Sequence, residues 1–372
     1  MTGSRVLRIR YFDIMRMMFL LWGIALNLVE VLEKLSNANG VTGREDDVRN
    51  LMKEYLKPYV DEVREDKLGN LIAFKQGKKD APIVMIAAHM DEVGLMIKNV
   101  KKKGFLQFTK IGGIDDRILL AQKVIVHTDK GPLAGVVGSK PVHIQTEAEK
   151  KKVIEADKLF IDIGAGDKEE AEKMGVQVGD VVSFDTKFAQ LSKDVVLGKA
   201  FDDRVGCAVM VETMKRLQNV DCNVYAVGTI QEEVGLRGAT IAAFQIEPDL
   251  GIAFDATVSG DTPGVVEGEA PANMGDGPVL TVADAGLIAH PKVLRLLIDS
   301  AKQNKISYQL ETGIRGATDA ARIALTREGV PSGVLSIATR YIHSPAAILN
   351  LDDVEKAVEL AVATIENIPK YF

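Results

Sequence analysis

The chain has 372 residues, a length that two domains commonly share. Hydrophobic residues make up 47% and charged residues 26%, a globular balance that excludes a disordered or fibrous protein. The formal net charge is -6, so the basic surface that nucleic-acid binding requires is missing. The two cysteines, Cys207 and Cys222, cannot form a disulfide framework and fit a reducing cytoplasm.

The first 22 residues differ in character from the rest of the chain. Arginines precede an apolar run at 17–29, a layout that resembles a secretion signal. The run has 13 residues, fewer than the roughly 20 that a membrane-spanning helix needs. No small-residue cleavage site follows it, and it merges into a helical pattern. We therefore expect residues 1–22 to be an appended extension and the protein to have no membrane role.

Two helices are expected next. Apolar side chains at 28–35 share one helical face, and Gly40 ends the pattern. Thr42 and Glu45 have the spacing of a capping box, which predicts the start of a second helix that Pro58 ends. Residues 63–75 then predict strand, with a turn at 68–70.

Unbroken apolar runs and helical patterns alternate through the rest of the chain. Such runs are typical of strands buried on both faces of a largely parallel sheet. The alternation predicts an α/β fold with a mixed, largely parallel sheet flanked by helices. The runs lie at 82–88, 223–230, 250–254 and 333–338, and the helical patterns at 204–217, 291–304, 318–328 and 352–368.

Residues 93–195 interrupt this alternation. They contain short alternating strands at 124–128, 133–137, 159–163 and 180–186, and one charged helical pattern at 146–157. We expect a small β-rich domain inserted into the α/β domain. The predicted boundaries are 23–92 and 196–372 for the α/β domain and 93–195 for the insert.

Residue types that bind metals follow the buried strand runs. In open α/β sheets the ligand crevice lies outside the carboxyl ends of the strands, so these side chains are expected to meet there. An Asp-Asp pair also precedes the helix at 204–217. The residues are His89, Asp91, Asp202, Asp203, Glu232, Glu233, Asp255 and His343.

This inventory suits two divalent cations. Two histidines, a bridging Asp, another Asp and a Glu would hold the ions about 3.5–4 Å apart and leave room for water. A further carboxylate must then take a proton from the water, and the adjacent Glu232 and Glu233 offer one base and one ligand. Each motif alone is more often structural; their coincidence at strand ends predicts the metal site.

Four segments resemble the TET-type aminopeptidases, also called deblocking or glutamyl aminopeptidases, some of which carry the label endoglucanase. The resemblance extends from about residue 28 to the end of the chain. It implies a zinc-peptidase-like fold for the α/β domain. The segments are AHMDEVG (88–94), GKAFDDR (198–204), QEEVGLRGA (231–239) and RYIHSP (340–345).

The resemblance also implies a role for each site residue. Glu232 is the general base that acts on a metal-bridging water, and Asp91 orients the imidazole of one ligand. Asp202 bridges the ions, and the peptide that joins it to Asp203 is expected to be cis. Asp319 has a supporting role. The ions are zinc or cobalt, held by His89, Asp202, Glu233, Asp255 and His343.

The insert resembles the PDZ-like lid domain through which family members form dimers and then tetrahedral dodecamers. His143 lies in the insert and either reaches an active site across a dimer contact or only fixes its own loop. His127 and His290 are read as ordinary surface or loop residues, and Cys207 as core. We expect residues 255–274 to shape the pocket for the first residue of the substrate.

We therefore expect a cytoplasmic aminopeptidase that hydrolyses the first peptide bond of short peptides with a free amino end. A metal-dependent carboxypeptidase or deacylase is the nearest alternative. A glycoside hydrolase (endoglucanase) also uses two carboxylates, but it would leave the histidines without a role. A non-enzymatic scaffold with structural metals is the remaining alternative, although structural sites are usually closed and rich in Cys.

Overall fold

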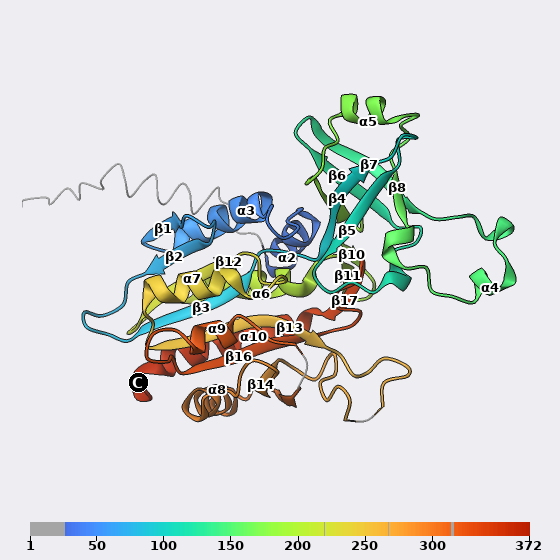
Figure 1. The fold of residues 1–372 in the computed structure, drawn as a ribbon. Coiled ribbons are helices and arrows are strands. Elements are labelled where there is room, and N and C mark those ends of the chain that lie inside the picture. Colours follow the sequence, from blue (N-terminus) through green and yellow to red (C-terminus); the bar gives the residue numbers. More distant parts are fainter. Residues whose placement is uncertain (1–26, 219, 267, 314–315) are drawn as a thin grey trace, which may run out of the picture.

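The computed structural model describes residues 27–218, 220–266, 268–313 and 316–372. The extension predicted at 1–22 lies outside these residues. An α/β part and a β-barrel make up the described structure, with the barrel near one end of the large sheet (Figure 1). Within the described residues, no helix is both long and apolar enough to cross a membrane.

An eight-stranded sheet forms the centre of the α/β part. Its middle strands β12, β3, β13 and β16 run parallel, while β2 and β14 run antiparallel to their inner neighbours. The prediction of a mixed, largely parallel sheet is therefore confirmed. The order is β1 (Glu62–Glu65), β2 (Leu71–Lys75), β12 (Asn223–Thr229), β3 (Ile83–His89), β13 (Leu250–Val258), β16 (Ser332–Thr339), β14 (Val279–Ala283) and β15 (Gln309–Thr312).

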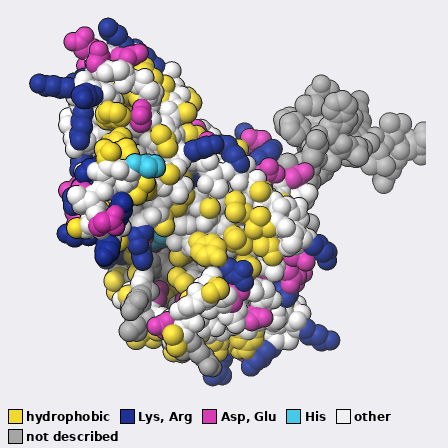
Figure 2. Space-filling view, turned by 90° about the vertical axis from the view of Figure 1, so that its right-hand side faces the viewer, with side chains coloured by type: hydrophobic (Ala, Val, Ile, Leu, Met, Phe, Trp, Pro, Cys, Tyr) yellow, Lys and Arg dark blue, Asp and Glu magenta, His cyan; other side chains and the backbone are white. Residues whose placement is uncertain are grey.

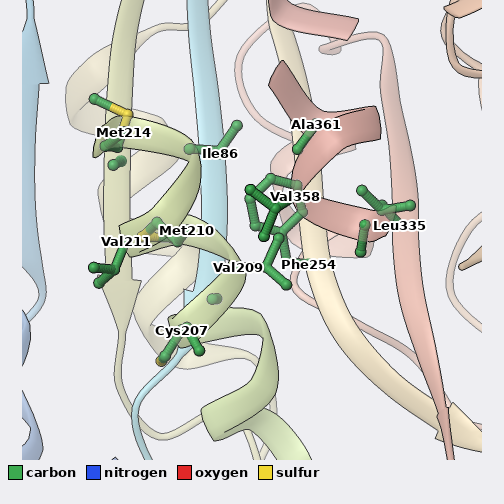
Figure 3. Packing of buried hydrophobic residues seen from close by; sticks show 14 of the residues in the cluster. Ile86, Cys207, Val209, Met210, Val211, Met214, Phe254, Leu335, Val358 and Ala361 are labelled. Carbon is green, nitrogen blue, oxygen red and sulfur yellow. The ribbon is translucent and has the colours of Figure 1, made fainter. Parts of the chain in front are cut away.

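Helices cover both faces of the sheet. Successive side chains of a strand point to opposite faces, so each face of the sheet contributes to its own core. In β3, Val84 and Ile86 join the larger hydrophobic core, whereas Met85 and Ala87 join a smaller one. Figure 3 shows part of the larger core, where α6 and α10 pack on the sheet. The larger core contains α2 (Leu28–Asn37), α3 (Asp46–Leu56), α6 (Phe201–Arg216), α8 (Pro291–Asn304) and α10 (Leu351–Asn367); the smaller one contains residues of α7 (Arg237–Ile246) and α9 (Ala320–Ala324).

Three helices of the α/β part differ from prediction. The capping box of Thr42 and Glu45 is wrong, because Glu45 is the N-cap of α3 and no side chain caps that helix. α9 is shorter than the predicted 318–328, because the chain leaves the helix at Leu325 and Arg327 adopts a left-handed backbone. α7 was not predicted, because its buried face consists mainly of alanines that give a weak apolar pattern.

The β-rich insert forms a closed barrel with its own hydrophobic core. The predicted helix at 146–157 is reduced to α4 (Glu147–Lys150), and α5 (Lys168–Met174) was not predicted. Asp167 caps α5 and the left-handed Gly175 ends it, two signals that the sequence contains. The barrel strands are β4 (Gly94–Val100), β5 (Leu106–Ile111), β8 (Phe160–Asp162), β7 (Gly131–Gly138), β6 (Lys123–Thr128) and β9 (Val181–Phe184).

A small three-stranded sheet lies beside the barrel (Figure 1). It contains β10 (Ala189–Gln190), β11 (Val195–Gly198) and β17 (Ala347–Asn350). β11 pairs with both of the others, so the chain that leaves the barrel is hydrogen-bonded to β17, the strand that follows β16 in the sequence. The domain boundary at 195 and the PDZ-like character of the insert stay predictions.

Candidate active site

The predicted metal-binding residues meet between the two parts of the molecule. His89 is the last residue of β3, and Glu232 and Glu233 follow β12. A small cavity there is lined by Asp202, Glu233 and His343 and, from the barrel side, by Val93 and Phe184. Asp255 lies inside β13, not after its end as predicted, because β13 pairs with β16 as far as Val258.

Asp202 sits between the two histidines. Its Oδ1 is 3.0 Å from Nε2 of His89, and its Oδ2 is 3.0 Å from Nε2 of His343. The other ring nitrogen of His343 is 3.0 Å from the carbonyl oxygen of Gly113, which can accept a hydrogen bond from it and leave a lone pair on Nε2. A carboxylate whose two oxygens face two different imidazoles has the arrangement of a bridging ligand. The Asp202–Asp203 peptide is cis, as predicted.

Two overlapping groups of side chains could hold a metal ion. Ligand atoms of His89, Asp202 and Glu233 lie within 4.8 Å of one another, and so do those of His89, Asp203 and Asp255. Oε1 of Glu233 is buried without a hydrogen-bond partner among the described residues, which fits an atom that ligates a cation. The two oxygens of Asp203 instead accept the N–H groups of His89 and Gly206, so this residue orders the backbone beneath the site.

Carboxylates dominate the electrostatics of the site. Burial, and then the charge of Asp202, raise the pKa of Glu233 to about 7. Burial raises the pKa of Glu232 well above its usual range, and the nearby charges of Asp255 and Asp319 raise it further. Burial also acts on Asp202, but hydrogen bonds from the two histidines bring its pKa below the usual value. Such crowding of acids favours the binding of cations.

Asp91 has more partners than predicted. Nδ1 of His89 is 3.4 Å from its Oδ1 and 3.2 Å from its backbone oxygen, consistent with the predicted orienting role. The same carboxylate accepts the backbone N–H groups of Glu232 at 3.0 Å and Glu233 at 3.2 Å, and the hydroxyl of Thr42 at 2.8 Å. Asp91 therefore links the imidazole to the two glutamates.

A buried ion cluster of Glu92, Lys199 and Arg204 lies next to these residues and was not predicted. Nζ of Lys199 is 2.7 Å and Nη2 of Arg204 is 3.2 Å from Oε1 of Glu92. All three side chains are at most 3% exposed, which is tolerable only because the charges are paired. Arg204 also donates to the carbonyl groups of Leu35 in α2 and of Met90, so the cluster joins α2 to the chain that follows His89.

Asp319 is buried behind the site at the N-cap of α9. It accepts the hydroxyl of Thr229, the last residue of β12, and its Oδ1 has no hydrogen-bond partner among the described residues. Burial raises its pKa to about 6. These contacts agree with a supporting place, and the role itself stays a prediction.

The remaining histidines and Cys207 do not line the cavity, although Sγ of Cys207 lies 3.2 Å from the carbonyl oxygen of His89. Cys207 is fully buried in the core. His290 is an exposed N-cap of α8. The interpretation of His127 as a surface or loop residue is wrong, because it lies half-buried in the barrel strand β6. Its Nε2 is 2.8 Å from the hydroxyl of Ser183 in the neighbouring strand β9. His143 is exposed in a one-turn 3-10 helix, and its reach across a dimer contact stays a prediction.

The predicted pocket segment at 255–274 is tied to the loop that carries His343. Arg340 pairs with Asp261, and Asp261 also accepts the hydroxyl of Ser259. Gly260 donates to the carbonyl oxygen of Ala272, which closes the base of the segment. That the segment selects the first residue of a substrate stays a prediction.

A family model and several related aminopeptidases point to one family. The sequence model of the M42 glutamyl aminopeptidase family matches residues 69–360 of this chain. A lysyl aminopeptidase of Pyrococcus furiosus is 38% identical over 91% of this chain and 97% of its own. An aminopeptidase structure from Desulfurococcus kamchatkensis is 44% identical with a TM-score of 0.88, covering 91% of this chain and 94% of that one. The TET1 peptidase of Pyrococcus horikoshii, which can assemble into a tetrahedron or a large octahedral shell, is 34% identical with a TM-score of 0.82, covering 91% and 99%.

Proposed function

The chain belongs to the M42 glutamyl aminopeptidase family and is a peptide hydrolase, and from this premise we propose that it is a two-metal aminopeptidase acting on peptides with a free amino end. One observation carries the two-metal part of the proposal. The oxygens of Asp202 face His89 and His343 at 3.0 Å each, near a Glu233 oxygen that has no hydrogen-bond partner in the part of the chain that the structure describes. The set of carboxylates and imidazoles fits two ions of zinc or cobalt.

We assign the ligands by their place around Asp202. His89 and Asp255 would hold one ion, Glu233 and His343 the other, and Asp202 both. When bound, the two ions would lower the pKa of a water molecule and polarise the scissile carbonyl. The protein contributes the placement of these side chains on elements of the fold: β3 carries His89, β13 carries Asp255 and the start of α6 carries Asp202.

Glu232 is the general base of the proposal. Its Oε2 is 4.0 Å from Nε2 of His89, close to the ligands, and its raised pKa suits a group that takes up and returns a proton. It would take a proton from the attacking water and deliver it to the leaving amine. The substrate ammonium would pair with an acidic group beside the ions, and the candidates are Glu232, Asp255 or a residue of the barrel.

We further propose that the protein assembles with copies of itself into dimers and a tetrahedral dodecamer in the cytoplasm. A related structure forms such shells. The arm of the barrel around α4 exposes apolar side chains, with Val142 54%, Ile144 67% and Val153 57% exposed, as interaction surfaces do. On the face in Figure 2, apolar side chains also gather below the barrel, and basic and acidic groups are interspersed.

Product analysis of a ten-residue peptide tests the function. We expect a ladder of products shortened from the amino end in the presence of cobalt or zinc, and none with a chelator or with Glu232→Gln. A matched peptide with an acetylated amino end should stay intact. Shortening from the carboxyl end would indicate a carboxypeptidase, release of acetate a deacylase, and no cleavage by the metal-loaded protein would refute the peptidase proposal.

A further inference from the structure

Residues 40–45, part of the connection between α2 and α3, lie against the chain at 91–92 and 231–233; we call them the linker segment. Its Val41 forms an isolated parallel bridge with Glu92. The N–H of Glu92 donates to the oxygen of Gly40 at 2.9 Å, and the N–H of Thr42 donates to the oxygen of Glu92 at 3.2 Å. The linker segment therefore runs alongside the chain that leaves β3.

The hydroxyl of Thr42 points from the linker segment at Asp91. Thr42 is 6% exposed, and its Oγ1 is 2.8 Å from Oδ2 of Asp91 and 3.4 Å from the backbone oxygen of Glu92. A hydroxyl has one hydrogen, which favours the nearer and charged acceptor. Asp91 in turn accepts the N–H groups of Glu232 and Glu233. The hydroxyl of Thr42 therefore helps to fix the backbone of both glutamates.

Glu45 provides the second contact of the linker segment. Glu45 is 2% exposed, and its Oε1 accepts the N–H of Gly43 at 2.7 Å and that of Gln231 at 3.3 Å. Gln231 has a φ of 53°, a left-handed conformation that L residues rarely adopt and that the surrounding structure must hold. Together, Thr42 and Glu45 secure residues 231–233.

We propose that Thr42 is a positioning residue for peptide hydrolysis and that Glu45 assists it. The inference rests on the proposed function, because Thr42 acts only through Asp91 on the base Glu232 and the ligand Glu233. Without the hydroxyl, Oδ2 of Asp91 loses its shortest hydrogen bond and the carboxylate can rotate away from the two N–H groups. The glutamates then lose their fixed distance from Asp202, while the fold keeps its core.

Thr42→Val and Thr42→Ser separate the hydroxyl from the shape of the side chain. We expect Thr42→Val to lower kcat for peptide hydrolysis about tenfold or more, with KM changed less than about threefold, as for other residues behind metal ligands. Thr42→Ser should restore kcat to within about threefold of the unchanged protein. Titration of the metal-free protein with cobalt should show affinity weakened about tenfold for Thr42→Val and little for Thr42→Ser.

Thr326→Val is the matched control, since Thr326 is 7% exposed and, just after the end of α9, donates to the carbonyl oxygen of Arg322 in that helix. It should leave kcat and cobalt affinity unchanged. The inference is overturned if Thr42→Val matches the unchanged protein in kcat and cobalt affinity, or if Thr42→Ser is impaired as much. An unchanged protein that cleaves no peptide refutes the proposed function, and the cobalt titration then decides the inference alone. Should Thr42→Val fail to fold, Glu45→Ala must lower kcat instead, and normal kcat refutes the inference.

Discussion

The molecule buries charge in two adjacent places in opposite ways. In the ion cluster, Glu92 meets Lys199 and Arg204, and although burial raises its pKa, these cations bring it below the usual value. In the adjacent active-site crevice, burial and neighbouring acids raise the pKa values of Glu232 and Glu233. In the cluster the negative charge of Glu92 is therefore balanced by the chain's own cations, which leave one net positive charge, whereas the crevice carries surplus negative charge. Balanced burial serves architecture, and surplus charge prepares a site for cations.

Asp202→Asn should have the largest effect on the crevice, because it removes the carboxylate shared between His89 and His343. We expect peptide hydrolysis to fall to background. A chelator should do the same to the unchanged protein, and added cobalt should restore that protein but not the variant. Asp299→Asn, which changes an acid paired with Tyr371, is the control and should stay active. Full activity of Asp202→Asn would contradict the bridging role.

Glu232→Gln should retain metal binding and lose the base. We expect kcat to fall by about 10²–10⁴, the usual contribution of a positioned general base. Cobalt titration of the variant should give an affinity close to that of the unchanged protein, because Glu232 is not among the proposed ligands. If the variant instead loses cobalt binding and keeps activity when cobalt is in excess, Glu232 is a ligand and the base lies elsewhere.

Glu92→Gln tests the balanced cluster. The change leaves Lys199 and Arg204 buried with an uncompensated charge, so we expect the free energy of unfolding to fall by about 3–5 kcal/mol. Chemical denaturation of the metal-free protein measures it. Glu155→Gln removes one partner of an exposed pair with Lys158 and should change the free energy of unfolding far less, because solvent screens that pair. Equal effects of the two variants would show that the buried cluster does not stabilise the fold.

The parallel sheet could be predicted from sequence because four unbroken apolar runs, separated by helical patterns, are typical of strands buried on both faces. The candidate site residues could be predicted because most of them stand at or after those runs, and Asp202 and Asp203 because they form an Asp-Asp pair before a helical pattern. The ion cluster could not, since Lys199, Arg204 and Glu92 look like surface residues until the burial is known. Thr42 and Glu45 show a different failure: the spacing that usually caps a helix here serves hydrogen bonds to distant loops, which local sequence does not reveal.

Glu233→Gln should have the smallest effect on the free energy of unfolding. In the metal-free protein it should raise this free energy, whereas Glu92→Gln lowers it. Its pKa is raised to about 7 in the folded state, against 4.5 when unfolded. A raised carboxyl pKa gives stability that is complete below the unfolded value and is lost as pH rises through the folded value. The unchanged metal-free protein should therefore weaken between about pH 4.5 and 7, and the variant should exceed it by about 1–3 kcal/mol at pH 8. Denaturation at pH 5 and pH 8 measures the difference, and added cobalt should reverse it, because only the unchanged protein gains a ligand. A variant less stable at pH 8 without metal would mean that the crevice, like the ion cluster, is balanced by the chain.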